Sequence, residues 1–342
     1  MSDILLREMS NAEIDWLVLS GDRRRLKDND TLIEANQPSD FLYLVLEGQL
    51  AINSPTNGSP ITQLTRGDLV GENWLFDEAT TASVTAPNSA LVLAIPREGI
   101  ASKLQQDISF AAHFYRTLAL LLSEQIRTLF ERSELLRYQS SQVVKEALFV
   151  FGELRDSDMD WMVSNGTVEK LHEGDILLHP GRPVDALYTV LDGQLVISTT
   201  DTPCDPLSAC RHGLTEQSVE HQYSPTAHLS RGGLPGIISF LDFRPLPVRI
   251  HASTESLLLS IPRQKVVIKL QSDLSFAARF YRVIAAQMES LLTAVISTGK
   301  ESMSDVSDLG ADGELDLAEL QQVCEGGAKF DWMLRRLGVG SR

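Results

Sequence analysis

The chain has 342 residues, of which 43% are hydrophobic and 22% are charged, a composition typical of soluble globular proteins with room for about two domains. Its net charge of −16 argues against nucleic acid as the main partner, because phosphate contacts need clustered Lys and Arg. Three cysteines, an acidic N-terminus and no apolar run longer than that near residues 118–122 indicate a cytoplasmic protein without a disulfide framework, signal peptide or membrane span.

The first predicted element is a short helix over residues 10–20. Ser10 is a suitable N-cap, and Glu13 stands three residues later, as in a capping box. The same pattern recurs over residues 156–163, with the two tryptophans 145 residues apart. The recurrence supports a helix at both places.

An alternating strand with an acidic-Gly turn follows at Asp40–Leu50 and returns at Asp185–Leu195, again at an offset of 145 residues. Each copy predicts a β-hairpin in which Gly48 or Gly193 supplies the positive φ of the turn. The chain is therefore predicted to be a tandem repeat.

Further short strands alternate with Gly, Pro, Asn and Asp, which favours a β-sandwich or roll. From about Glu98 to Tyr138 the apolar residues instead take helical spacing, and the second copy does the same. The two apolar stripes are Phe114, Leu118, Leu122, Ile126 and Leu129, and Phe276, Phe280, Ile284, Met288, Leu291 and Val295.

The offset grows to 166 residues between Phe110–Arg116 and Phe276–Arg282. Most of this growth lies in a polar, Pro-containing hairpin insertion near residues 200–222. Cys204 and Cys210 lie in it with several histidines, but their spacing matches no zinc template, so a mobile loop is favoured over a metal or redox clip. The expected domains are 1–140, 141–299 with the insertion, and an acidic tail at 300–342.

This order of elements resembles the cyclic-nucleotide-binding domain, the β-roll module of catabolite-activator-type regulators and kinase regulatory subunits. The resemblance covers residues of about 10–138 and 155–297. It implies an α+β fold with two jelly-roll-like β-rolls, each with a short leading helix and a long C-terminal helix. Too few residues, and too few basic ones, follow Val295 for a helix-turn-helix domain, so DNA binding is not expected.

In that family, a phosphate-binding cassette runs from a Gly-Glu pair, whose Glu holds the ribose hydroxyl, to an Arg that pairs with the cyclic phosphate. The first copy has Gly71 and Glu72, but Thr80 stands at the Arg position. The resemblance implies ligand-binding roles for Gly71, Glu72, Thr80, Thr81 and Ser83.

The second cassette begins at Gly236, but Ile237 stands at the Glu position and Leu246 at the Arg position. Arg244 and Arg249 lie close by in sequence and are the candidate substitutes. Neither copy therefore has the full Glu-Arg pair, and the ligand could be cAMP, cGMP, another small anionic nucleotide, or none.

The acidic tail contains a loop similar to an EF-hand, although Gly310 replaces one ligand. Eight acids and no Lys or Arg lie between Glu301 and Glu325, and a solvated acidic connector is the favoured interpretation. The alternative is a Ca²⁺ site formed by Asp308, Asp312, Glu314, Asp316 and Glu319.

No nucleophile-base, P-loop or paired-carboxylate arrangement indicates an enzyme. We therefore expect a non-catalytic regulatory or sensor protein that takes a small nucleotide ligand. The alternative is a ligand-independent scaffold that binds a protein partner. The two long helices predict either a pseudo-dimer within the chain or a homodimer.

Overall fold

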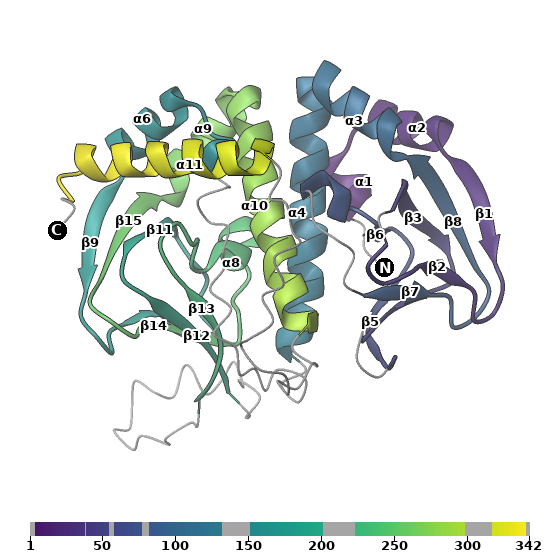
Figure 1. The fold of residues 1–342 in the computed structure, drawn as a ribbon, viewed down its shortest axis with the longest axis horizontal. Coiled ribbons are helices and arrows are strands. Elements are labelled where there is room, and N and C mark those ends of the chain that lie inside the picture. The colour runs from purple at the N-terminus through teal and green to yellow at the C-terminus, as the bar shows by residue number, and fades with distance from the viewer. Residues whose placement is uncertain are drawn as a thin grey trace. The chain divides into compact units, whose positions relative to one another are not determined.

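The computed structural model describes residues 4–37, 39–54, 58–76, 82–131, 151–200, 223–297 and 317–339 (Figure 1). The chain divides into two compact units. Unit 1 comprises Met1–Thr128 and Asp273–Glu301, and unit 2 comprises Leu129–Ser272 and Ser302–Arg342. Each unit is described by itself below. The expected domain bounds at 140 and 299 stay a prediction.

The described part of unit 1 holds two four-stranded antiparallel sheets, ordered β1-β8-β3-β6 and β2-β7-β4-β5. Its strands are β1 (Asp22–Leu26), β2 (Thr31–Ile33), β3 (Phe41–Glu47), β4 (Leu50–Asn53), β5 (Pro60–Leu64), β6 (Leu69–Val70), β7 (Ser83–Thr85) and β8 (Ala90–Pro96). Its helices are α1 (Ile4–Glu8), α2 (Asn11–Ser20), η1 (Asn73–Phe76), α3 (Arg97–Gln106), α4 (Ile108–Glu131) and α10 (Leu274–Ser297).

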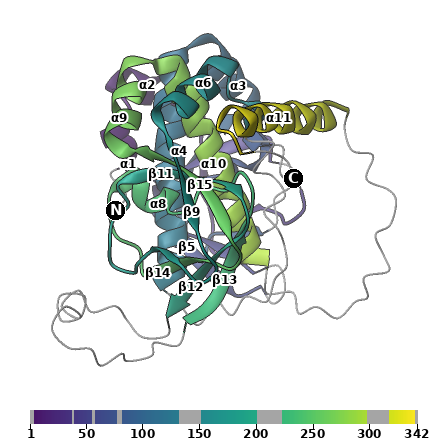
Figure 2. The same ribbon diagram turned by 90° about the vertical axis from the view of Figure 1, so that its left-hand side faces the viewer.

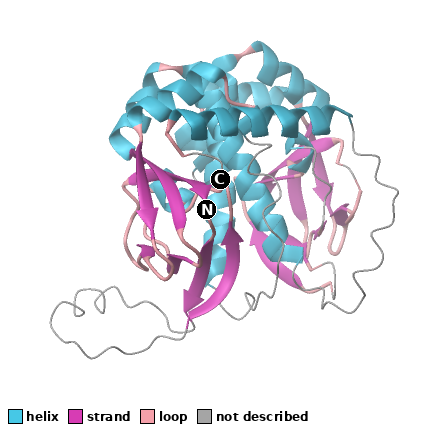
Figure 3. Cartoon of the chain, turned by 60° about the vertical axis from the view of Figure 1, so that its left-hand side comes forward, coloured by secondary structure: helices cyan, strands magenta, loops and turns pink. Residues whose placement is uncertain are grey.

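Unit 2 repeats this plan with antiparallel sheets ordered β11-β15-β9 and β10-β14-β12-β13. Its strands are β9 (Thr167–Leu171), β10 (Ile176–Leu178), β11 (Ala186–Asp192), β12 (Leu195–Thr200), β13 (Tyr223–Leu229), β14 (Val248–Ala252) and β15 (Ser256–Pro262). Its helices are α6 (Asp156–Asn165), α8 (Ile237–Asp242), α9 (Arg263–Ser272) and α11 (Leu317–Arg336). The expected α+β fold with helices beside β-rolls is confirmed, and Figure 3 shows strands and helices by colour.

The predicted hairpins at Gly48 and Gly193 are wrong in one respect. Both glycines have positive φ, 79° and 89°, but the strands on either side lie in different sheets. A Cβ on Gly48 would come 2.7 Å from the carbonyl oxygen of Ser89. The glycine therefore lets the chain turn a corner from one sheet to the other, close to the backbone before β8, instead of folding β3 back on β4.

The interior of the first roll is lined by alternate residues of the second sheet. Ile52 of β4 lies opposite Val84 of β7, and both are buried together with Leu50 and Ala86. Ser83 and Thr85 fall on the other face, because successive side chains of a strand alternate. Burying each of these large aliphatic side chains contributes about 1.5–3 kcal/mol.

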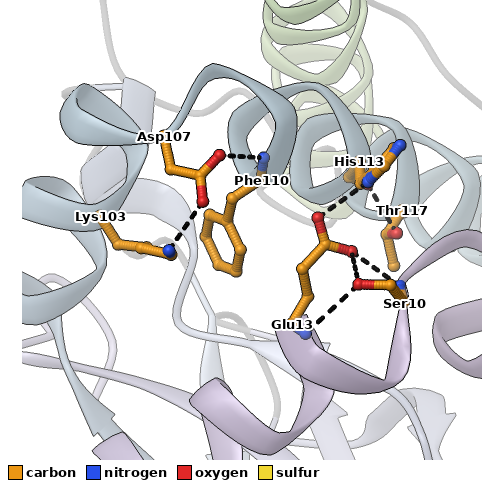
Figure 4. A network of polar contacts seen from close by, with 7 residues as sticks. All are labelled: Ser10, Glu13, Lys103, Asp107, Phe110, His113 and Thr117. Atoms are coloured by element: carbon orange, nitrogen blue, oxygen red, sulfur yellow. Dashed lines mark hydrogen bonds and ion pairs between the residues drawn. The ribbon is translucent and has the colours of Figure 1, made fainter.

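The leading helix is held as predicted. The side chain of Glu13 accepts a hydrogen bond from the Ser10 backbone N–H at 2.7 Å, and the Glu13 N–H donates to Ser10 Oγ at 3.4 Å, which completes the capping box. Glu13 also contacts His113 of α4, Oε1 to Nδ1, at 2.8 Å (Figure 4). One carboxylate thus ties the start of α2 to the long helix.

The expected long helix of each repeat is broken by an aspartate. The carboxylate of Asp107 accepts a hydrogen bond from the Phe110 N–H at 3.0 Å and caps α4 (Figure 4). Asp273 does the same for Phe276 at 2.9 Å and caps α10. Each aspartate begins a new helix by satisfying an N–H group that has no partner within the helix.

Helices α4 and α10 lie side by side in unit 1 (Figures 1 and 2). The guanidinium carbon of Arg116 on α4 is 5.8 Å from the ring centre of Tyr281 on α10. The stripe residues of α4 are buried, as are Phe276, Phe280, Ile284 and Met288 on α10. By its contacts, α10 therefore belongs with the first roll, although it follows the second in sequence. Among the described residues, no helix combines the length and hydropathy needed to cross a membrane.

Candidate functional site

The first cassette starts where β6 ends. Gly71 has φ 87°, and a Cβ at this position would lie 2.7 Å from the carbonyl oxygen of Phe41. Only glycine fits this turn without strain. The turn brings Glu72 to the base of the short helix η1, which is the place that the sequence predicts for the ribose-binding acid.

Glu72 is 5% exposed, and its Oε2 has no hydrogen-bond partner. Burial raises the pKa of this carboxyl to about 7, although its own backbone N–H acts in the opposite direction. A buried carboxyl without a partner for one oxygen is costly, and it gains stability when a hydroxyl or amine donates to that oxygen. Glu72 is therefore suited to accept a hydrogen bond from a polar ligand.

The next residue connects the cassette with a helix that is distant in sequence. Asn73 Nδ2 donates to Oε1 of Glu289 on α10 at 2.6 Å, and Glu289 is 3% exposed. The indole Nε1 of Trp74 is also buried without a partner. The cassette thus contains two unpartnered polar atoms, next to a buried bridge to a long helix.

The remaining residues predicted for this site are divided. Thr80 and Thr81 lie outside the described residues. Ser83 begins β7 opposite Asn53, and Asn53 Nδ2 donates to Thr85 Oγ1 at 2.9 Å. The structure thus describes Gly71, Glu72 and Ser83, and the ligand role of all five residues stays a prediction.

The second cassette has a different chemistry. Gly236 has φ 76° and caps α8, but Ile237 at the Glu position and Leu246 at the Arg position are both buried. The carbonyl oxygen of Leu246 accepts a hydrogen bond from the N–H of Gly181 at 3.0 Å. Apolar side chains thus occupy the positions where the family pattern has charged ones.

The two candidate arginines of this cassette lie apart from Leu246 in their surroundings. Arg244 is exposed, and its Nε pairs with Oδ2 of Asp242 at 2.8 Å. Arg249 is half-buried on β14, on the same strand face as His251. Burial first, and then the charge of Arg249, lower the pKa of His251. Binding of a ligand by Arg244 or Arg249 stays a prediction.

The candidate metal residues are mostly outside the described ranges. Asp308, Asp312, Glu314 and Asp316 are outside them, and Glu319 lies in α11 at a position where only the backbone is described. Cys204 and Cys210 are outside as well. Within the described ranges, no three His, Cys, Asp or Glu side chains gather as metal ligands would. The calcium prediction therefore has no support.

Two contacts of the site were not foreseen from the sequence. The Asn73–Glu289 hydrogen bond joins residues 216 positions apart, and no local pattern indicates it. Arg263, the first residue of α9, donates from Nε to the carbonyl oxygen of Phe240 at 3.2 Å and lies 4.7 Å from the ring centre of Phe243. The repeat offers a signal for this second contact, because Arg97 begins α3 in the same way.

Comparisons with solved structures return regulatory proteins, all at low similarity. The regulatory subunit of a cAMP-independent protein kinase A from Trypanosoma cruzi bound to guanosine is 16% identical over 79% of this chain and 80% of that chain, with a TM-score of 0.29. The regulatory domain of Toxoplasma gondii protein kinase A with cAMP is 12% identical over 79% and 92%, with a TM-score of 0.29. The N-terminal domain of a Streptomyces coelicolor transcriptional regulator is 22% identical over 50% and 98%, with a TM-score of 0.32.

Among curated proteins, none matches the chain. The family profile described as "Cyclic nucleotide-binding domain" matches residues 23–107. This range begins in β1 and includes both sheets of the first roll, Gly71, Glu72 and η1. Residues 23–107 therefore form a cyclic nucleotide-binding domain.

Proposed function

We propose that the chain is a non-catalytic cytoplasmic sensor with two tandem β-rolls, in which the first roll binds a small nucleotide. The observation that carries this proposal is the unpartnered, buried Oε2 of Glu72 inside the segment that matches the domain profile. A ribose hydroxyl that donates to this oxygen would remove the cost of the missing hydrogen bond.

Binding would be relayed through the residue next to Glu72. Asn73 contacts Glu289 on α10, so a shift of η1 on ligand binding would act directly on that helix. Helix α4 lies beside α10 in unit 1, and the position of this helix pair is the proposed output. Such coupling requires only that the ligand bind one arrangement of η1 more tightly than the other.

The affinity for a cyclic phosphate is expected to be reduced. Thr80 replaces the arginine of the family pattern, and losing one charge-assisted hydrogen bond costs about 1.5–3 kcal/mol, roughly ten- to a hundredfold in affinity. The ligand class remains the cyclic nucleotides, cAMP and cGMP first, bound with weakened phosphate recognition.

The second roll favours the alternative function, a ligand-independent surface for a protein partner. Ile237, Phe240 and Leu246 fill its cassette with buried apolar side chains. Such a cassette packs its own roll and offers no charged group of its own to a phosphate. We therefore assign ligand binding to unit 1 and a scaffolding role to unit 2.

Thermal unfolding with and without ligand tests the assignment, because a ligand that binds only the folded state raises Tm. The panel is cAMP, cGMP and cyclic dinucleotides at millimolar concentration, with the wild type, E72A and E98Q. Glu98 is an exposed acid on α3 and serves as the matched control. We expect a rise in Tm for the wild type and E98Q that E72A lacks. No rise with any ligand would leave the scaffold as the function. Light scattering on the same samples separates a pseudo-dimer, one chain in mass, from a homodimer.

A further inference from the structure

The C-terminal helix α11 is docked on unit 2 by one apolar face. Phe330 and Met333 are fully buried, whereas Asp331 and Trp332 between them are exposed. The ring of Phe330 meets the ring of Phe151 edge-on, with centres 5.1 Å apart. A spacing of three residues places Phe330 and Met333 on the same side of the helix, so α11 has a defined inward face.

A lysine fixes the helix on the segment that leads into α6. Lys329 Nζ donates to the carbonyl oxygens of Gly152 and Leu154, at 2.8 and 2.7 Å. An ammonium that bonds two backbone carbonyls makes charge-assisted contacts of defined geometry. The contacts of Lys329 and Phe330 together specify one position for α11 along this surface.

A second contact reaches the approach to the second cassette. Arg231 Nη2 lies 2.5 Å from Oδ1 of Asp331, and its guanidinium carbon is 5.0 Å from the ring centre of Phe330. Arg231 stands between the end of β13 and Gly236, at the start of α8. One arginine side chain therefore connects α11 with the loop that precedes the cassette helix.

That loop is itself fixed to a central strand. The N–H of Gly232 donates to the carbonyl oxygen of Val190 at 2.8 Å, and the N–H of Val190 donates to Gly233 at 2.9 Å. The backbone of the loop is thus paired with β11 on both sides of Arg231's neighbour. A movement of the loop would displace Arg231, and a loss of α11 would remove two contacts from Arg231.

We propose that α11 is an intramolecular clamp on the second cassette, so that docking of α11 and the closed form of residues 230–242 stabilise each other. The surface around Phe151, Gly152, Leu154 and Arg231 is then a docking site for an amphipathic helix of the Lys-Phe-Asp pattern, occupied by the chain's own C-terminal segment. By thermodynamic reciprocity, whatever opens the cassette releases α11, and whatever removes α11 loosens the cassette. The clamp does not depend on a ligand in the first cassette.

Hydrogen exchange of the full chain, read by mass spectrometry, tests the clamp. In R231A we expect amide exchange over residues 326–337 to rise roughly two- to fivefold, the range expected for loss of a half-exposed ion pair. In F330A we expect a larger rise there and a rise over residues 230–242. R335A, an exposed arginine on the same helix, is the control and should match the wild type.

The decisive comparison is between the two ends of the contact. Faster exchange in α11 of F330A with wild-type exchange over residues 230–242 would overturn the clamp, because docking would then be independent of the cassette. D331N keeps the apolar face and provides the same test if F330A does not fold. The double charge reversal R231D/D331R should restore exchange toward the wild type, and a failure to restore it would also contradict the proposal.

Discussion

Asn73 and Glu289 are joined by a hydrogen bond of 2.6 Å across 216 residues of sequence. Asn73 begins η1, next to the unpartnered Glu72, and Glu289 lies on α10. This contact makes the last long helix part of the first roll's cassette, and it is the physical basis for expecting a ligand there to act on a helix.

Replacing Asn73 by Ala should destabilise unit 1. The substitution removes a hydrogen bond to a buried carboxylate, which typically costs about 1–3 kcal/mol. Urea unfolding followed by circular dichroism should show an earlier transition. Q63A, on the exposed side of β5, should leave the transition in place. An N73A curve that coincides with the wild type would show that the bridge contributes nothing.

The buried carboxyl of Glu72 predicts a specific pH dependence. Its pKa is raised from 4.5 to about 7 by burial, so the folded state holds a proton that the unfolded state has released between these values. Stability from this group is therefore present below about pH 4.5 and is lost as pH rises through 7, by roughly 3 kcal/mol in total. E72Q should flatten this part of the stability profile between pH 5 and 8. An unaltered slope in E72Q would contradict the raised pKa.

Glu13 predicts the opposite slope. Burial acts to raise the pKa of Glu13, but hydrogen bonds from the Ser10 backbone, His113 and the Ser10 hydroxyl outweigh it and lower the pKa. The stability from this group is present above the ordinary pKa of 4.5 and is lost as pH falls through the lowered value. Acid unfolding of E13Q should begin from a less stable state at pH 6 and depend less on pH. D15N, which changes an exposed acid of the same helix, should follow the wild type.

A glycine pair separates backbone requirement from general sensitivity. Gly71→Ala places a side chain at φ 87°, with its Cβ 2.7 Å from the carbonyl oxygen of Phe41. We expect it to lose more than the roughly 1–2 kcal/mol that a left-handed conformation costs alone. Gly99→Ala in α3 meets nothing within 4 Å, and alanine favours the helix by about 1 kcal/mol. Differential scanning calorimetry should show a lower Tm for G71A and an equal or higher Tm for G99A.

The sequence predicts the parts of the fold that repeat. The capping box of Ser10 and Glu13, the short strands and the two apolar helix stripes all depend on local spacing, which propensity and periodicity describe well. The turn at Gly48 shows the limit of this reasoning. A positive φ is a local requirement, but whether β3 pairs with β4 or the chain turns into another sheet depends on partners such as β8, which lie about 45 residues away.

The site was predicted less completely for the same reason. Gly71 and Glu72 follow a local pattern, and the structure places them together at the turn before η1. The contact of Asn73 with α10 depends on how a helix from the far end of the chain packs, and no single-sequence pattern carries that information. The aspartates 107 and 273 could have been used, since both stand at the same place in the repeat and both begin a helix.

Calorimetric titration of the full chain with cAMP and cGMP, for the wild type and E72A, tests the central claim most directly. The account predicts one binding site per chain, in unit 1, and its loss or a drop in affinity of tenfold or more in E72A. Two equal sites per chain, or wild-type binding by E72A, would contradict the assignment of the ligand to Glu72, and a silent titration would contradict the sensor itself.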